Sequence, residues 1–366
     1  MFFFFKKYFR ITARLFLSAA LGLIILSCTK KDSDKVLTVY NTTFEPEDLK
    51  LKKIYSIESP DISCPADFKF NAAGELFVLE NLSGKIKIFD QKNFDIKDSI
   101  VLPDDAFMSS FNFIKDDIVL SGSDRKIYIY DRKLNTYKIK KTDNGMPENI
   151  ELLAQDKIFG TFVINTSGRE ETFLGLDLKM VDKNFDNIKL LSSFFTPYHR
   201  GDIDPEIPVF PFAADKTNEI LYVAISSEKV YKIFAYEFDL NLKFIIRNKL
   251  NTQKFTDKEL ERIKKVAEKF KKAPFKRKDK TFIEDMFIDD EGRLWVRRAS
   301  SAKKYGTDTS LFDIYDDEKY MLTVKIDKGQ RCGRIMVKNN KIFISDPLGS
   351  KISVFSFDNK KIRDKE

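Results

Sequence analysis

The chain of 366 residues has one histidine, His199, only 14 glycines and three cysteines. A single histidine excludes a multi-histidine metal cage and a histidine pair for acid–base catalysis. The glycine-rich loops that hold phosphates and the nucleophile elbow of serine hydrolases are also missing from the sequence. We therefore predict a loop or surface role for His199, assign no catalytic residue and favour a non-enzymatic protein.

The sequence also lacks a hydrophobic run long enough for a membrane span. The N-terminal charge-free run, Leu15 to Ser27, has thirteen residues, whereas about 20 are needed to cross a bilayer. Basic residues precede this run and Cys28 follows it, which is the order of an export signal. A plain secretory signal, or an uncleaved helix extended back through Arg14, are the alternatives.

The junction residues Ile25, Leu26, Ser27 and Cys28 resemble the lipobox of bacterial lipoproteins. The resemblance implies that residues 1–27 are a signal peptide, that Cys28 is lipidated and that residues 28–48 form the lipidated tether. Two or three acyl chains make such an attachment effectively permanent. Since Thr29 rather than Asp follows the cysteine, the resemblance also implies an outer-membrane address in the cell envelope, with the membrane as the first partner.

Two stretches, DFKFNAAGELFV at 67–78 and DMFIDDEGRLWV at 285–296, align without a gap. Each is typical of a strand, a tight glycine turn and a second strand. A third strand ending in an aromatic-Asp turn and a fourth strand follow both stretches. Weaker copies lie at 111–140 and 334–358, and two degenerate copies lie between 150 and 250. The period-two pattern therefore predicts six units of four strands.

The last unit lacks its own fourth strand, and a lone strand, LKLKKIYSIE at 49–58, precedes the first unit. Pairing these two would close a ring and remove its exposed edges. The sequence thus predicts an all-β, six-bladed β-propeller with four-stranded blades, closed by an N-terminal strand. Over 49–358 the pattern resembles the propellers of the NHL and TolB-like group, and residues 359–366 are predicted to be a polar tail. A two-domain β-sandwich is the alternative.

Cys64 and Cys332 precede the inner strands of the first and last units. A closed ring makes these strands neighbours, and an exported chain permits a disulfide between them. Such a bridge would stabilise the closure. Two buried free thiols are the competing interpretation, and the sequence leaves both open.

One insertion, residues 251–282, interrupts the repeat and is predicted to contain a helix. Thr256 and Glu259 match a capping box, and Pro274 marks the stop. Residues 254–280 carry twelve Lys or Arg and five Asp or Glu, so their net charge is +7. The basic residues of the predicted helix are Arg262, Lys264, Lys265, Lys269 and Lys272.

A solvated helix face is the simpler interpretation of this charge. Attraction to an anionic surface, such as phospholipid headgroups, is the functional alternative. Nucleic acid is not expected as a partner, because the nearby aromatic residues Phe255 and Phe270 are assigned to the docking face rather than to base stacking.

In a propeller, the face where the chain enters the inner strands, called here the top face, collects loops from distant parts of the chain. The sequence therefore predicts a binding or scaffold site on the rim of that face, for an envelope protein, peptide or glycan. Because strands alternate, we expect Trp295 to pack and only one of the two following arginines to face the opening. The candidate rim residues are Asp67, Asp285, Arg297, Arg298, Arg334, His199 and Asp202.

A calcium-dependent hydrolase or lactonase in the channel is the alternative function. Related six-bladed hydrolases hold calcium with acidic and amide side chains of several inner strands, a set that does not map onto this sequence. DIDPE at 202–206 offers oxygen ligands but lacks the glycine and spacing of a calcium loop. No cofactor and no metal ligand is therefore assigned.

Overall fold

The computed structural model describes most of the chain from Val36 onward. The described residues are 36–38, 46–58, 62, 65–80, 83–90, 92–103, 108–122, 126–141, 145–154, 157–167, 172–198, 210–269, 279–305, 309–327, 334–345, 351–358 and 362. The signal peptide, Cys28, Cys64, Cys332, His199, Asp202 and Lys272 of the sequence predictions lie outside these residues.

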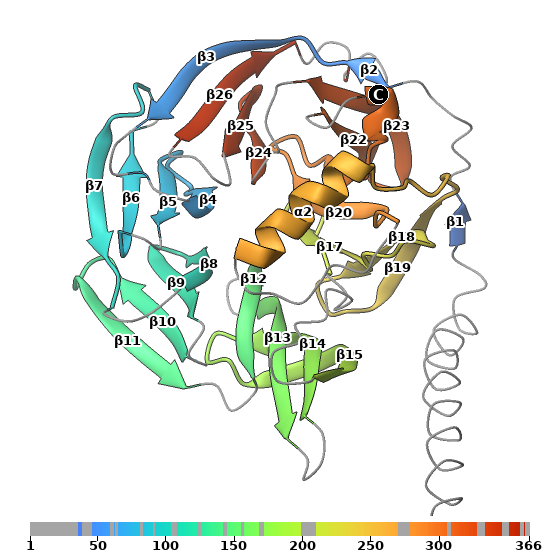
Figure 1. Ribbon diagram of the computed structural model, residues 1–366. Helices are drawn as coiled ribbons and strands as arrows, with labels where there is room; N and C mark the ends of the chain where they lie inside the picture. The colour runs from blue at the N-terminus through green and yellow to red at the C-terminus, as the bar shows by residue number, and fades with distance from the viewer. Residues whose placement is uncertain are drawn as a thin grey trace, which may run out of the picture.

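Six antiparallel sheets stand around a central axis as the blades of a propeller (Figure 1). Blade 1 comprises β4 (Pro65–Phe70), β5 (Leu76–Glu80), β6 (Lys85–Phe89) and β7 (Ile96–Val101). Blade 2 comprises β8 (Met108–Ile114), β9 (Asp117–Gly122), β10 (Lys126–Asp131) and β11 (Thr136–Lys141). Blade 3 comprises β12 (Met146–Ala154), β13 (Lys157–Ser167), β14 (Thr172–Asp182) and β15 (Asn187–Tyr198). Blades 4 and 5 comprise β16 (Phe212–Asp215), β17 (Ile220–Ala224), β18 (Tyr231–Glu237) and β19 (Leu242–Asn248), then β20 (Ile283–Ile288), β21 (Leu294–Arg298), β22 (Thr309–Asp316) and β23 (Lys319–Asp327).

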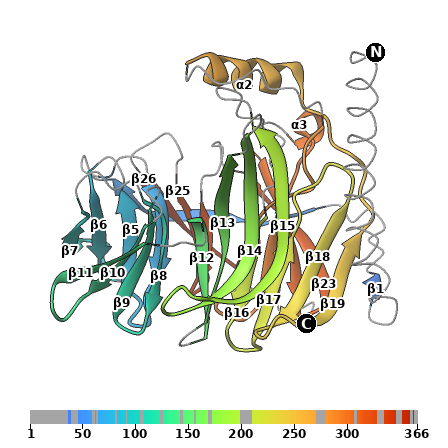
Figure 2. The same ribbon diagram turned by 90° about the horizontal axis from the view of Figure 1, so that it is seen from below.

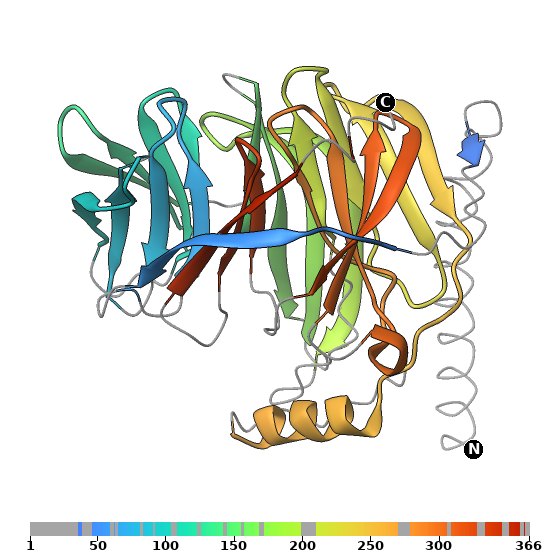
Figure 3. The same cartoon turned by 90° about the horizontal axis from the view of Figure 1, so that it is seen from above.

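Blade 6 is built from both ends of the described chain. Its first three strands are β24 (Ile335–Lys338), β25 (Lys341–Ser345) and β26 (Lys351–Phe357), and its fourth is β3 (Leu51–Glu58). β3 pairs antiparallel with β26, and Ile57 is opposite Ile352. In Figure 3 the blue strand β3 crosses in front of the red strands of this blade, as its outermost strand. The predicted ring closure is confirmed.

Turn chemistry explains why the blades repeat. Gly74 and Gly292 have φ of 79° and 84° in the turns between first and second strands, a conformation that glycine adopts at little cost. The predicted aromatic-Asp turn at Phe89-Asp90 is also present. The carboxylate of Asp90 accepts a backbone N–H two residues on, at 2.7 Å, and Asp182 at the end of the third strand of blade 3 does the same. Such Asx turns end the third strand and start the fourth.

The hydrophobic core lies between blades. Each of six clusters of buried residues joins two adjacent blades around the ring. Ile57 of blade 6, for example, packs in one cluster with Phe68 of blade 1, and Trp295 of blade 5 packs with Phe357 of blade 6. Trp295 is fully buried, as predicted. Because the sheets contact around a ring rather than in two layers, the β-sandwich alternative is wrong.

Two features differ from the sequence expectations at the chain ends. Within 28–48, predicted as tether, β1 (Val36–Thr38) pairs in parallel with β19 and β2 (Glu47–Asp48) with β23. Part of this segment therefore adds a fifth strand to blades 4 and 5. Within the predicted polar tail, Ile362 is fully buried in the cluster between blades 5 and 6, because its apolar side chain gains free energy on leaving water.

The insertion at residues 251–282 contains the helix α2 (Asp257–Lys269), which is shorter than the insertion itself. It lies across the top face, which we define as the face where the inner strands begin (Figure 2). The predicted capping box is confirmed, because Thr256 N–H donates to Glu259 Oε2 at 2.8 Å and Glu259 N–H to Thr256 Oγ1 at 3.3 Å. A second short helix, α3 (Ala302–Tyr305), follows β21.

Candidate functional site

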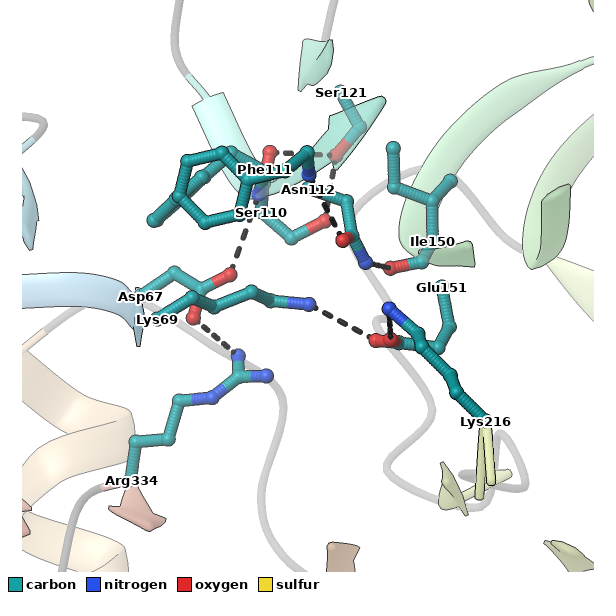
Figure 4. Close-up of polar contacts among 11 residues, drawn as sticks. Asp67, Lys69, Ser110, Phe111, Asn112, Ser121, Ile150, Glu151, Lys216 and Arg334 are labelled. Atoms are coloured by element: carbon teal, nitrogen blue, oxygen red, sulfur yellow. Dashed lines mark hydrogen bonds and ion pairs between the residues drawn. The ribbon is translucent and has the colours of Figure 1, made fainter. Parts of the chain in front are cut away.

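Inner strands from several blades bring charged and polar side chains to the central channel (Figure 4). Asp67 and Lys69 are two residues apart on β4, so the strand turns them to the same side. Glu151 comes from β12, and Lys216 directly follows β16. Arg334 precedes β24. These residues belong to blades 1, 3, 4 and 6, and only the closed ring brings them together.

The first pair joins blades 6 and 1. Arg334 Nη1 lies 2.9 Å from Asp67 Oδ1, and Phe111 N–H of blade 2 donates to Asp67 Oδ2 at 3.3 Å. Asp67 is fully buried. Burial raises the pKa of this carboxyl, and the charges of Arg334 and Lys69 reduce the rise. Burial acts to lower the pKa of Arg334, but Asp67 and Asp285 outweigh it, so the Arg334 pKa lies above its usual value.

The second cluster is a lysine–glutamate–lysine triad. Lys69 Nζ lies 3.0 Å from Glu151 Oε2, and Lys216 Nζ lies 3.6 Å from Glu151 Oε1. Burial alone would raise the pKa of Glu151, but the charges of Lys69 and Lys216 outweigh it and lower that pKa to about 2. Glu151 is therefore ionised at neutral pH, and the triad carries a net charge of +1.

Amide and hydroxyl groups connect blade 2 to this layer. Asn112 Nδ2 donates to the Ile150 carbonyl oxygen at 3.4 Å, which links β8 to β12. On the same inner strand, Ser110 Oγ lies 2.9 Å from Ser121 Oγ of β9, and both serines are buried. The Asn112 contact therefore holds β8 beside β12, the strand that carries Glu151, and the serine pair joins β8 to β9 within blade 2.

A cavity of about 630 Å³ extends from these charged side chains toward the face of the ring opposite the top face. We call it the bottom cavity; its lining includes Lys69, Glu151, Lys216, Arg334 and the ends of the inner strands, with Phe70, Phe113, Phe287, Lys115, Asp290 and Lys338. Its mouth lies where inner strands turn into second strands, as at Asn71 and Gly292. Its volume is in the range of small-molecule sites.

Among the described residues, those predicted for the top rim do not all gather into one site. Asp67 and Arg334 pair at the inner end of the bottom cavity, and Asp285 is half-buried near them. Arg298 Nε lies 2.9 Å from the buried Asp313, and Arg297 Nε lies 3.4 Å from Glu284. Neither arginine lines the bottom cavity, and both pair with carboxylates on β20 and β22, the strands that flank β21 in blade 5.

Sequence reasoning missed Lys69, Asn112, Glu151 and Lys216. Lys69 had a usable signal, since it follows Asp67 by two residues on an inner strand. Glu151 stands as a single charge in the apolar run NIELLA, which is a weaker sign. Lys69 and Glu151 are 82 residues apart, so no local pattern connects them.

Lys280 anchors the base of α2 to blade 5. Its Nζ donates to Glu259 Oε1 at 2.6 Å and to the Ser300 carbonyl oxygen at 2.9 Å. Lys280 is buried, and its charge lies 5.5 Å from the Phe255 ring centre. Desolvation works against ionisation of Glu259, but the hydrogen bonds from Lys280 and Thr256 outweigh it and lower the Glu259 pKa.

The basic residues of α2 are only partly described. Lys264 and Lys265 are exposed, and Lys265 Nζ pairs with Glu261 Oε1 at 2.9 Å. Arg262 and Lys269 lie within the helix, but their side chains lie outside the described part. The attraction of this helix to an anionic surface stays a prediction.

The predicted disulfide also stays a prediction, because both thiols lie outside the described residues. Among the described residues, Asp67 and Arg334 form the 2.9 Å ion pair.

Within the described ranges, His, Cys, Asp and Glu do not form any group of three or more that could hold a metal ion. No helix of the described part has the length and apolar character needed to cross a membrane.

The fold defines the chain as a six-bladed β-propeller with a polar cavity in its channel. No family model matches the sequence, and no curated protein matches it. Among solved structures, virginiamycin B lyase from Staphylococcus aureus is similar at 10% identity and a TM-score of 0.47, over 84% of this chain and 99% of the lyase. BBS1N in complex with ARL6DN matches at 10% identity and a TM-score of 0.42, over 82% of this chain and 79% of that one.

Proposed function

We propose that this protein is a lipid-anchored binding module of the cell envelope, and that its ligand occupies the bottom cavity. The observation that carries the proposal is the Lys69–Glu151–Lys216 triad, which three different blades supply to one cavity. Lys69 is buried and the Glu151 side chain is 22% exposed, whereas half of the Lys216 side chain is exposed. Holding the Lys69–Glu151 pair largely away from water costs free energy, and well-packed apolar residues often replace such pairs without loss of stability. A channel that served only as scaffold would gain little from such a triad.

The envelope anchor rests on the sequence at Cys28, where a basic and an apolar segment precede the cysteine. The N-terminal segment then pairs with the outer edges of blades 4 and 5 through β1 and β2. A ring held in this way would leave the mouth of its channel open to envelope molecules such as peptides, glycans or smaller solutes.

Binding is favoured over hydrolysis because the acidic side chains of the described part form no group of three that could hold a metal ion. The carboxylates that line the cavity, such as Glu151 and Asp215, instead already have partners within the protein. An ion-paired carboxylate with a low pKa, such as Glu151, is a poor general base at neutral pH. We therefore propose recognition, without turnover, as the task of the cavity.

Two adjacent alanines give a matched test. Ala72 lines the bottom cavity at its mouth, whereas Ala73 is exposed in the same turn and does not line it. The full-length protein would be purified in mild detergent, incubated with a small-molecule extract of the cells and examined by native mass spectrometry. We expect an adduct on the wild type and on Ala73→Trp, and none on Ala72→Trp, because tryptophan fills the mouth. An adduct retained by Ala72→Trp, or no adduct on the wild type, would contradict the proposal.

A further inference from the structure

The carboxylates that line the bottom cavity already have partners. Glu151 accepts from Lys69 at 3.0 Å and has Lys216 nearby. Asp215 is buried and accepts from Thr217 N–H at 2.9 Å and from Asn218 N–H and Nδ2 at 3.1 and 2.8 Å. These groups have little remaining capacity to accept a hydrogen bond from a ligand.

The turn of blade 5 is similar. Asp289 accepts from Arg293 Nε at 2.9 Å and from Trp295 Nε1 at 2.8 Å, and Arg293 Nη2 neutralises it at 2.9 Å. Asp290, at the mouth, accepts from Asn339 N–H at 2.9 Å. The acidic side chains thus stabilise turns and neighbouring blades.

The lysine side chains at the mouth of the cavity have fewer interactions within the protein than its carboxylates do. Lys216 Nζ lies 3.6 Å from its nearest carboxylate oxygen, beyond a good hydrogen bond, and half of its side chain is exposed. Neither Lys115 nor Lys338 forms an ion pair with any of the described residues. Each lysine ammonium has three N–H donors. The cavity therefore has unused donors and positive charge at its mouth.

These three lysines surround the mouth. Lys115 follows β8 of blade 2, Lys216 follows β16 of blade 4 and Lys338 ends β24 of blade 6. They come from alternate blades, so they approach the axis from different directions. Lys69 and Arg334 supply further positive charge at the inner end.

The walls between these cations include aromatic surface. Phe70, Phe113 and Phe287 line the cavity and are each half-buried. A space of about 630 Å³ is far larger than a bare inorganic ion needs. The apolar walls suit a ring or chain attached to the charged group.

From this surplus of donors beside aromatic walls we propose that the bottom cavity binds a small organic anion, in which carboxylate or phosphate oxygens are attached to an apolar or ring-shaped group. Lys216 would move from Glu151 to the oxyanion, and Lys115 and Lys338 would complete the contacts at the mouth. The inference rests on the proposed function, because it names the ligand class of the same cavity.

The test uses isothermal titration of the full-length protein in a non-ionic detergent. The anionic probes are phenyl phosphate and phthalate; phenyl glucoside and benzyltrimethylammonium are neutral and cationic probes of similar size. We expect the anions to bind and the other two probes to give no heat. Lys216→Ala should weaken phenyl phosphate binding roughly tenfold, the effect of losing one charge-assisted hydrogen bond.

Lys229→Ala is the matched control, because Lys229 is exposed on the same blade and does not line the cavity; it should bind like the wild type. Glu151→Gln should bind phenyl phosphate more tightly, since it removes the competing carboxylate. Lys338→Ala, altered at the mouth rather than in the triad, should weaken binding as Lys216→Ala does. Trp295 fluorescence would verify that each variant is folded.

The outcomes separate the two proposals. Binding of the neutral or cationic probe, abolished by Ala72→Trp, would overturn the ligand class and leave the cavity as the site. Anion binding unchanged in both Lys216→Ala and Lys338→Ala would also overturn the inference. Failure of every probe, together with no adduct from the cell extract, would count against the proposed function as well.

Discussion

The substitution Ile57→Ala tests the ring closure directly. Ile57 is 3% exposed in β3, lies opposite the fully buried Ile352 and packs in the cluster between blades 6 and 1. Truncating a buried isoleucine to alanine costs about 2–5 kcal/mol, because it removes apolar contacts and leaves a cavity. We expect about 3 kcal/mol here. Ile54 in the same strand is 42% exposed, so Ile54→Ala should change stability by less than about 0.5 kcal/mol.

Urea unfolding followed by tryptophan fluorescence is the assay. Trp295 is the only tryptophan and is fully buried between blades 5 and 6, with its ring centre 6.2 Å from that of Phe357. If the free energy of unfolding falls by about 3 kcal/mol per molar urea, a loss of about 3 kcal/mol lowers the unfolding midpoint by about 1 M urea. Equal midpoints for Ile57→Ala and Ile54→Ala would refute the reasoning, since β3 would then contribute no buried surface to the ring.

Three further predictions each concern a single residue. Lys280→Ala should raise hydrogen exchange across α2, because it removes the contacts to Glu259 and to the Ser300 carbonyl oxygen; unchanged exchange would show that other contacts hold the helix. The Glu151 pKa falls from 4.5 to about 2 on folding, so the stability from this carboxylate is present above pH 4.5 and is lost as the pH falls toward 2. Glu151→Gln should therefore lose less stability than the wild type across that range, and equal losses in acid denaturation would contradict the assignment. Cys28→Ser should move the protein from the membrane fraction to the soluble fraction on cell fractionation, and retention in the membrane would exclude the lipid anchor.

The sequence allowed the fold to be predicted because its signals are local and repeated. Gly74 and Gly292 occupy equivalent turns, and the carboxylates of Asp90 and Asp182 end equivalent strands. The closure by β3 followed from counting strands, because the last unit had only three strands and the strand at 49–58 belonged to no other unit. These features depend on residues a few positions apart, and backbone sterics limit what such stretches can form.

The candidate site depended more on the tertiary structure than the fold did. The sequence indicated the top rim, and it included Arg297 and Arg298, whose guanidinium groups pair with Glu284 and Asp313. The choice of these partners depends on the register between β21 and the two strands beside it in blade 5. A one-residue change in register would reverse which face each side chain occupies.

By itself, the amino-acid sequence determined the period of the strands, the turns that join them and the number of blades, because each is set by residues close together in the chain. Only the tertiary structure decided that Lys69, Glu151 and Lys216 meet, and that their cavity opens opposite α2. The physical reason is that closing the ring places inner strands from all six blades around one axis. Charges more than 60 residues apart then lie within 4 Å of one another.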